Sequence, residues 1–286
     1  MQMTFRWYGD GNDDITPEMI RQIPGVGGLV WALHDKQPGE IWTVEEIEKV
    51  RARIEGAGFH MDVVESVNVH DDIKIGLPTR DQYIENYKTT LKNLAKFGVK
   101  VVTYNFMPIF DWTRTDLFHP LEDGSNALYY EKSKIQDDYK EMAEYILKNL
   151  HGKTFPGWEP ERMAKLDELF EAYRPVTKEK LWENLQYFLE AIMPTCHETG
   201  IKMAIHQDDP PWDIFGIPRL LCDKESIGRF LHMVDDEYNC LCLCSGSLGA
   251  NMENNVADII RTYCDRIAFA HIRNLRHYSN GDFSEV

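Results

Sequence analysis

Three short apolar runs in the C-terminal half of the chain each end on a residue type that binds metal ions. The runs are 201–206, 240–244 and 266–271, and they end on His206, Cys244 and His271. In a parallel α/β barrel the carboxyl ends of the strands meet at one mouth, where the chemistry takes place. Imidazole and thiolate groups brought together there would leave coordination positions open for substrate and would suit Mn, Fe or Zn. The pattern therefore predicts a metal-dependent enzyme.

Each of these three residues also has a plainer interpretation, as an ordinary strand-end or capping residue. His206 opens the sequence His-Gln-Asp-Asp-Pro-Pro, a stiff polar loop that includes Asp208 as a catalytic candidate. Cys240 and Cys242 share a strand face with Cys244, and we expect them to be small core residues. Their alternating spacing argues against a zinc knuckle, which normally takes two thiolates from a tight C-x₂₋₄-C turn.

Polar and aromatic side chains also occur at predicted strand ends in the N-terminal half. With Asp208, the further catalytic candidates, expected to hold a carboxylate and hydroxyls, are Arg6, Asn105 and Arg273. The candidates for contact with substrate are Trp7, His34, Glu65, His70, Arg114 and Ser247. This mixture suits a polyhydroxylated acid, although a surface or packing role remains an alternative for each residue taken singly.

The elements that must position these residues alternate between strand and helix. Strand-like runs lie near 3–8, 28–34, 60–67, 99–107, 201–206, 240–245 and 267–273. Between them, apolar residues recur at helical spacing, for example over 43–54, where Thr43 and Glu46 form a capping-box pattern, and over 80–97. Gly58, Gly98 and Gly200 follow predicted helices. Such alternation predicts a parallel sheet.

Counting strands favours a TIM (β/α)₈ barrel whose last βα unit is missing from the given chain. Seven strands are found where eight are required, and residues 274–286 are too few for another helix and strand. We expect a single domain over 1–286, with a helical insertion at 126–195 between strands four and five. Helices within it are predicted at 139–150, 161–173 and 178–193. This insertion adds helical surface, so we expect a homodimer or higher homo-oligomer.

Composition excludes several classes of function. The net charge of −16, from 47 acidic and 31 basic residues, argues against nucleic acid and anionic membrane surfaces as partners. No run of about 20 apolar residues predicts a membrane-spanning helix. The N-terminus does not resemble a signal peptide, and the six cysteines do not suggest a disulfide framework, so we expect a cytoplasmic protein. The Gly25–Gly28 run precedes a strand, which is the wrong order for dinucleotide binding.

Several of these motifs together resemble the mannonate dehydratase family over essentially the whole chain. The matching stretches are Phe5–Gly9, Trp31–His34, Val64–Val67 with His70, Tyr104–Pro108, Phe110–Thr115, His206–Pro211, Leu243–Ser247 and Ala270–Arg273. Gln207 departs from the proline expected at that position. The family also has an Asp and a His at the end of an eighth strand, as fourth metal ligand and acid/base residue, and this sequence has no such segment.

The resemblance implies a barrel related to xylose isomerase, with Mn(II) or Fe(II) bound by His206, Cys244 and His271. It implies dehydration of D-mannonate to 2-keto-3-deoxy-D-gluconate in hexuronate (glucuronate) catabolism. Two alternatives remain at this point. One is a metal-dependent sugar isomerase or epimerase of the xylose-isomerase type, and the other is an inactive truncated barrel.

Overall fold

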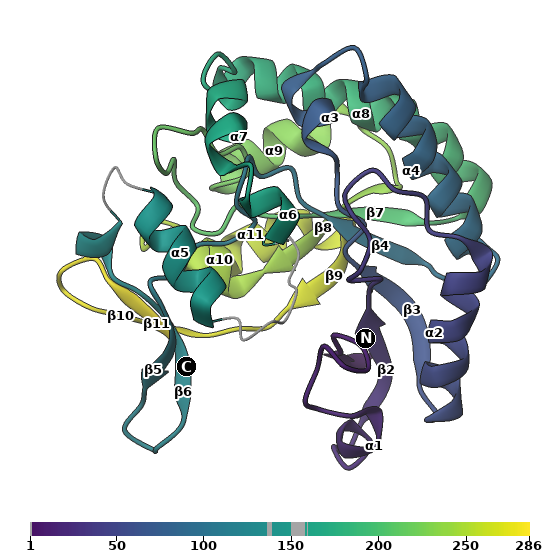
Figure 1. Cartoon of the computed structure of the whole chain (residues 1–286), viewed down its shortest axis with the longest axis horizontal. Coiled ribbons are helices and arrows are strands. Elements are labelled where there is room, and N and C mark those ends of the chain that lie inside the picture. The colour runs from purple at the N-terminus through teal and green to yellow at the C-terminus, as the bar shows by residue number, and fades with distance from the viewer. Residues whose placement is uncertain (1, 136–138, 150–157, 159) are drawn as a thin grey trace.

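All seven predicted strands are present, and they pair into one parallel sheet. The computed structural model describes residues 2–135, 139–149, 158 and 160–286. The strands are β1 (Met3–Arg6), β2 (Val26–Trp31), β3 (His60–Glu65), β4 (Val101–Tyr104), β7 (Lys202–His206), β8 (Asn239–Cys244) and β9 (Ile267–His271). Their order is β1-β2-β3-β4-β7-β8-β9, so that β1 and β9 are the edge strands of a curled, half-barrel sheet (Figure 1). The predicted α/β fold is confirmed.

The described helices are α1 (Pro17–Ile20), α2 (Val44–Gly56), α3 (Asp71–Ile75), α4 (Arg80–Ala95), α5 (Tyr139–Asn149), α6 (Pro160–Met163), α7 (Leu166–Tyr173), α8 (Lys178–Thr199), α9 (Lys224–Met233), α10 (Ser245–Gly249) and α11 (Val256–Tyr263), with 3₁₀ turns η1 (Lys132–Lys134) and η2 (Cys264–Arg266). Helices follow most of the strands, and α2, α4 and α8 cover the outer face of the parallel sheet (Figure 1). The predicted capping box is present at the start of α2, and Gly200 ends α8 in the left-handed conformation. Among the described residues, no helix is long and apolar enough to cross a membrane.

The longest helix, α8, ties the outer layer to the strands. Its buried face includes Phe188, whose ring meets Tyr87 of α4 edge-on at 5.1 Å and Tyr104 of β4 at 5.9 Å. Burial of such large aromatic side chains contributes strongly to the hydrophobic core. Strand β4, which directly precedes Asn105, is therefore held from outside by α4 and α8.

A second, antiparallel sheet was missed by the sequence analysis. It consists of β5 (Asp116–Pro120), β6 (Asn126–Tyr130), β10 (Leu275–His277) and β11 (Phe283–Glu285), in the order β10-β11-β6-β5. These strands are short, and β11 pairs with β6 from a distant part of the sequence. The predicted insertion at 126–195 thus contains a strand as well as helices, and predicted residue 150 lies outside the described residues. The single-domain assignment stays a prediction.

One buried ion pair connects the barrel to the helices that follow the small sheet. Both Nε and Nη2 of Arg162, on α6, donate to the carboxylate of Asp71, on α3, at 3.0 and 3.1 Å. The hydroxyl of Tyr173, on α7, donates to the same carboxylate at 2.6 Å. Burial favours the neutral acid, but the charges of Arg162 and Lys74 outweigh it and hold the pKa of Asp71 well below its usual range.

This pair makes stability depend on pH in a defined direction. The pKa of Asp71 is lower in the folded than in the unfolded chain, where it is about 3.9. The stabilisation is therefore complete above that value and is lost as pH falls below it. We predict that Asp71→Asn lowers the unfolding free energy of the metal-free chain by about 3 kcal/mol at neutral pH. The difference should shrink as the pH falls to about 4 or below, measured by urea unfolding.

Asp62→Asn is the matched control, because it removes an exposed ion pair. Asp62 lies 3.3 Å from Lys100, and the two side chains are 36% and 72% exposed. Such pairs contribute at most about 1 kcal/mol. A loss on Asp71→Asn that is the same at neutral and acidic pH would contradict the assignment.

Candidate functional site

The three predicted metal ligands lie together at the carboxyl ends of three adjacent strands. One side-chain donor atom from each of His206, Cys244 and His271 can be chosen so that all three lie within 4.8 Å of one another. Cys244 pairs directly with His271 in the parallel ladder, and His206 pairs with Cys242. Cys244 is fully buried, whereas both histidines are partly exposed. One sulfur and two imidazole donors this close together are a donor set that can bind a metal ion.

Neighbouring groups fix the orientation of these donors. Nδ1 of His206 lies 2.6 Å from the carbonyl oxygen of Gln207, so a proton on Nδ1 leaves Nε2 as the metal donor. The backbone N–H of Cys244 donates to Oε1 of Gln207 at 2.8 Å. Gln207 therefore contacts two of the three candidate ligands. Its side chain was noted in the sequence only as a departure from the expected proline.

The electrostatic surroundings favour the thiolate form of Cys244. Burial alone would favour the thiol, but Arg273 and the imidazoles of His206 and His271 outweigh it and pull the pKa of Cys244 well below the usual range. Cys242 is different, because burial raises the pKa of its thiol to about 11. Of these two neighbouring cysteines, Cys244 is thus the one whose sulfur is available as a ligand.

Glu65, the last residue of β3, lies beside His271. Its Oε2 is 3.1 Å from Nε2 of His271. Burial opposes the charged carboxylate, yet the nearby charges of His271 and Arg6 lower the pKa of Glu65 to about 2. Cys242 and this contact with Glu65 together raise the pKa of His271, against the effect of burial. Glu65 is therefore an ionised partner that orients an imidazole.

Arg6 ends β1, and His34 lies three residues after the end of β2. Nη1 of Arg6 donates to the carbonyls of Trp7 and Val30, at 3.0 and 3.1 Å, and Nη2 lies 3.4 Å from Nε2 of His34. Burial, and then the charge of Arg6, lower the pKa of His34 to about 3, so its imidazole is neutral at physiological pH. Trp7 itself is buried. Arg6 and His34 are both partly exposed.

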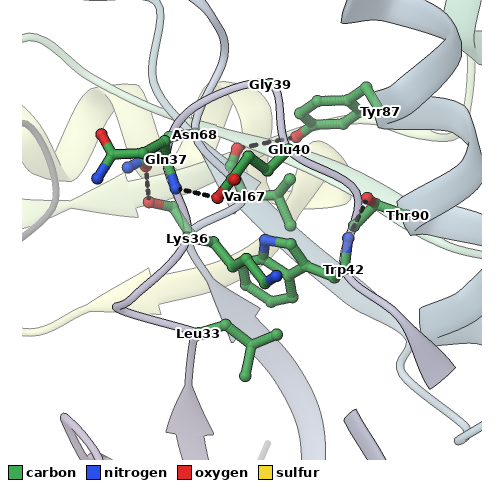
Figure 2. Close-up of a pocket in the computed structure, with 11 residues that line it drawn as sticks. Leu33, Lys36, Gln37, Gly39, Glu40, Trp42, Val67, Asn68, Tyr87 and Thr90 are labelled. Atoms are coloured by element: carbon green, nitrogen blue, oxygen red, sulfur yellow. Dashed lines mark hydrogen bonds between the residues drawn. The ribbon is translucent and has the colours of Figure 1, made fainter. Parts of the chain in front are cut away.

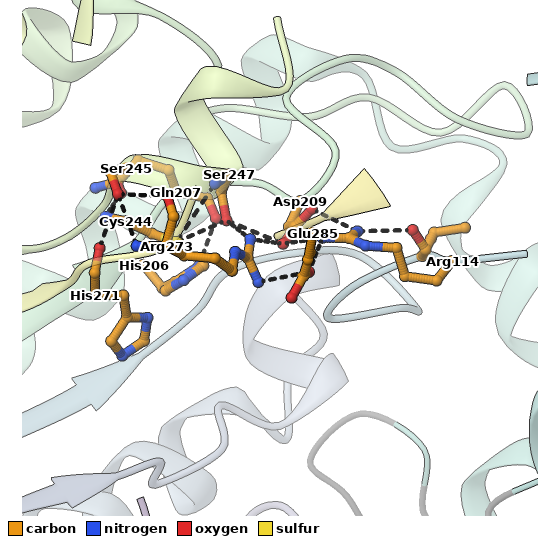
Figure 3. A network of polar contacts seen from close by, with 11 residues as sticks. Arg114, His206, Gln207, Asp209, Cys244, Ser245, Ser247, His271, Arg273 and Glu285 are labelled. Carbon is orange, nitrogen blue, oxygen red and sulfur yellow. Dashed lines mark hydrogen bonds and ion pairs between the residues drawn. The ribbon is translucent and has the colours of Figure 1, made fainter. Parts of the chain in front are cut away.

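A buried carboxylate–arginine network lies beside Cys244 (Figure 3). Both oxygens of Asp209 accept hydrogen bonds from Arg114, at 2.8 and 3.1 Å, and Oδ2 also accepts from Arg273 at 2.7 Å. Oε1 of Glu285, on β11, accepts from Arg114 at 2.9 Å and pairs with Arg273 at 3.1 Å. Burial opposes ionisation of Asp209, but the two arginines outweigh it and hold its pKa far below the usual range.

Several predicted site residues are engaged elsewhere in the structure. Asp208 accepts hydrogen bonds from the backbone amides of Leu220 and Leu221, and burial raises its pKa. His70 caps α3 and stacks on Tyr83 at 3.6 Å. Arg114 is 1% exposed within the network just described. The catalytic or substrate-contact roles suggested for these three residues stay predictions, and their surroundings favour structural roles.

Two small hollows lie near strand ends, and neither is lined by the three candidate ligands. The first, of about 20 Å³, lies between Leu33, Trp42, Asn68 and Thr90 (Figure 2). It has room for about one water molecule. The second, of about 10 Å³, is bordered by Lys74, Asn105, Asp111 and Arg162. Asn105, whose Oδ1 accepts from the N–H of Met107 at 3.2 Å, is the predicted site residue found there.

Asp209, Gln207 and Glu285 were not among the predicted site residues. The first two lie in the loop that begins at His206, so their position next to a predicted ligand was a usable signal. Glu285 gave no signal, because it reaches the site only through β11, a strand that the sequence analysis did not predict.

Comparisons with known proteins identify the family to which the whole chain is similar. The family model for D-mannonate dehydratase (UxuA) matches residues 1–286. A mannonate dehydratase of Shouchella clausii is 57% identical over 287 aligned residues, which cover 100% of this chain and 80% of that protein. The crystal structure of mannonate dehydratase from Streptococcus suis serotype 2 superposes with a TM-score of 0.85 at 42% identity, covering 100% of this chain and 76% of that one.

A more distant structure supports the fold alone. A xylose isomerase-like TIM barrel protein of Mycobacterium smegmatis superposes with a TM-score of 0.52 at 12% identity, covering 100% of this chain and 79% of that one. The isomerase alternative therefore gains no support beyond a shared fold, whereas whole-chain similarity points to the dehydratases. By its sequence and its structure, this chain belongs to the D-mannonate dehydratase family.

Proposed function

We propose that the chain dehydrates D-mannonate to 2-keto-3-deoxy-D-gluconate with a divalent metal, Mn(II) or Fe(II), held by His206, Cys244 and His271. The observation that carries the proposal is the convergence of one thiolate and two imidazole donors within 4.8 Å. The donor set fits Fe(II) well, and harder oxygen ligands from substrate would suit either metal. Three protein ligands leave coordination positions open, as a catalytic site requires.

A bound divalent cation would supply a Lewis acid that stabilises negative charge developing on the substrate carboxylate. The chain's own residues bind and orient the substrate around that position. Arg6 has five N–H donors, and the contacts to Trp7, Val30 and His34 use three of them. The remaining N–H groups are available for a substrate carboxylate or hydroxyl. Neutral His34 and the amide of Asn105 are further hydrogen-bonding groups for a sugar chain.

The reaction needs a proton to leave C2 and a hydroxyl to leave C3. Glu65 keeps the imidazole of His271 oriented through a contact of 3.1 Å. In this arrangement Glu65 is a positioning residue.

The direct test is turnover of D-mannonate by the metal-stripped chain, with and without added Mn(II) or Fe(II). We expect 2-keto-3-deoxygluconate to form only with metal. Cys244→Ser should lower metal affinity by more than the roughly 10- to 100-fold typical of losing an outer-sphere contact, because it replaces a ligand. Metal content after dialysis against a weak chelator measures this.

Cys240→Ser is the matched control. Cys240 lies on the same strand and is buried, but its sulfur contacts the carbonyl of Glu237 instead of the candidate ligands. We expect metal affinity to remain within about twofold of the parent value. Equal metal content in the parent chain and Cys244→Ser would contradict the proposed metal site.

Two of the three arginines suggested by the sequence, Arg6 and Arg114, should respond differently to replacement by lysine. Arg6→Lys keeps the charge but loses the planar fork, so we predict a roughly tenfold loss in kcat/KM with little change in stability. Arg114→Lys breaks a buried bidentate pair with Asp209, so we predict a loss of about 3 kcal/mol in the unfolding free energy. Steady-state kinetics and urea unfolding on both variants measure these effects. An unchanged kcat/KM in Arg6→Lys would count against substrate contact.

We also propose that the enzyme works in the cytoplasm, in hexuronate catabolism, as a homo-oligomer. Six cysteines without disulfides suit a reducing compartment. Met252 and Ile272 are 74% and 81% exposed, which supports association. Sedimentation that returns only the 33.3 kDa monomer would contradict the oligomer.

A further inference from the structure

The sulfur of Cys244 has a hydrogen-bonding neighbour that is not itself a candidate metal ligand. The hydroxyl of Ser247, in the first turn of α10, lies 3.2 Å from Sγ of Cys244, and the Ser247 backbone N–H donates to the same sulfur at 3.4 Å. Ser247 is fully buried. Its burial leaves no open path to a substrate, although the sequence suggested substrate contact. Its position favours an action on the sulfur.

The remaining contacts of the hydroxyl decide where its single proton is needed. Nη2 of Arg273 donates to the Ser247 oxygen at 3.0 Å, so that oxygen already accepts a hydrogen bond. Its proton then has two possible acceptors, which are Sγ of Cys244 and Oδ2 of Asp209, the latter at 3.0 Å.

Of the two acceptors, Asp209 gains less from the Ser247 proton. Its Oδ2 already accepts from Arg114 and from Arg273. If His206 and His271 bound a cation through their ring nitrogens, those nitrogens would not donate hydrogen bonds to the sulfur. The amide and the hydroxyl of Ser247 would then be the donors to the sulfur. The arrangement therefore favours donation of the hydroxyl proton to Cys244.

The side chain of Ser247 is held in place by residues other than Cys244. Asp209 and Arg273 contact its oxygen, and the side chain of Arg273 lies directly against Gly246, where any added Cβ would collide with it. Arg114 and Glu285 fix these two residues in turn (Figure 3). The hydroxyl thus has few alternative positions.

We propose that Ser247, held by Asp209 and Arg273, is a positioning residue that donates a hydrogen bond to the Cys244 sulfur and thereby sets its strength as a metal ligand. This inference rests on the proposed metal site. A hydrogen bond to a thiolate stabilises the sulfur lone pairs, orients them, and reduces the charge that the sulfur gives to the metal.

The test uses Co(II) alone as a spectroscopic probe of the metal-stripped chain. The parent chain should show a sulfur-to-cobalt charge-transfer band. In Ser247→Ala the band should persist, because Cys244 is still a ligand, but move to longer wavelength, because the lone pairs rise in energy. Co(II) affinity, measured by competition with a chelator, should fall by about 10- to 100-fold, because the loss of the donor that stabilises and orients the thiolate outweighs the gain in sulfur donation. Ser247→Thr keeps the hydroxyl and should restore the band toward its parent position.

Ser284→Ala is the matched control for the loss of a buried serine hydroxyl. Ser284 is fully buried on β11, and its hydroxyl lies 3.3 Å from that of Tyr278. The Ser284→Ala variant should be less stable than the parent chain, but its sulfur-to-cobalt band should stay at the parent position. A folded Ser247→Ala variant with the parent band position and the parent affinity would overturn the inference while leaving the metal site standing. A parent chain without a sulfur-to-cobalt band would overturn the proposed metal site, and this inference with it.

Discussion

The pairing register of β7, β8 and β9 is the constraint on which the candidate site depends. Cys244 is aligned with His271, and His206 is aligned two residues before Cys244. A slip of one residue would turn the sulfur to the outer face, where Leu241 and Leu243 pack in the main core. A slip of two would bring Cys242, which in the native register lies about 6–7 Å deeper along the strand, to the position of Cys244. The apolar residues of β8 therefore determine which thiol meets the imidazoles.

The loop after β7 distributes its polar side chains in different directions. His206 faces the other candidate ligands, Gln207 accepts from the Cys244 amide, Asp208 holds the backbone at Leu220 and Leu221, and Asp209 binds the two arginines. Burying the carboxylate of Asp209 is costly, and its several hydrogen bonds offset much of that cost. The network therefore contributes geometric precision more than net stability. Through Glu285 it also fastens the small antiparallel sheet to the ligand-bearing strands.

The sequence was most informative about the parallel strands and about the residues at their carboxyl ends. All seven strands of the parallel sheet were predicted, because each is an apolar run bounded by helical segments, and the common direction of parallel strands brings their terminal residues together. The convergence of His206, Cys244 and His271 followed from that rule alone.

The remaining features depend on contacts between distant segments, which local patterns do not reveal. Strands β5, β6, β10 and β11 are short, and β11 finds its partner far away in the sequence. Arg114 and Arg273 read as substrate-binding residues because a cationic side chain at a strand end suits an acid. Their carboxylate partners, Asp209 and Glu285, became visible only in the folded chain. Ser247 was likewise predicted to contact substrate, and its burial became visible only in the folded chain.

X-ray absorption at the metal edge of the Fe(II)-loaded chain tests the central claim most directly, because it counts the atoms bound to the metal. The account predicts one sulfur neighbour together with two imidazole rings, from Cys244, His206 and His271. A first shell of oxygen and nitrogen atoms without sulfur would contradict it, because the metal would then lie away from the ends of β7, β8 and β9.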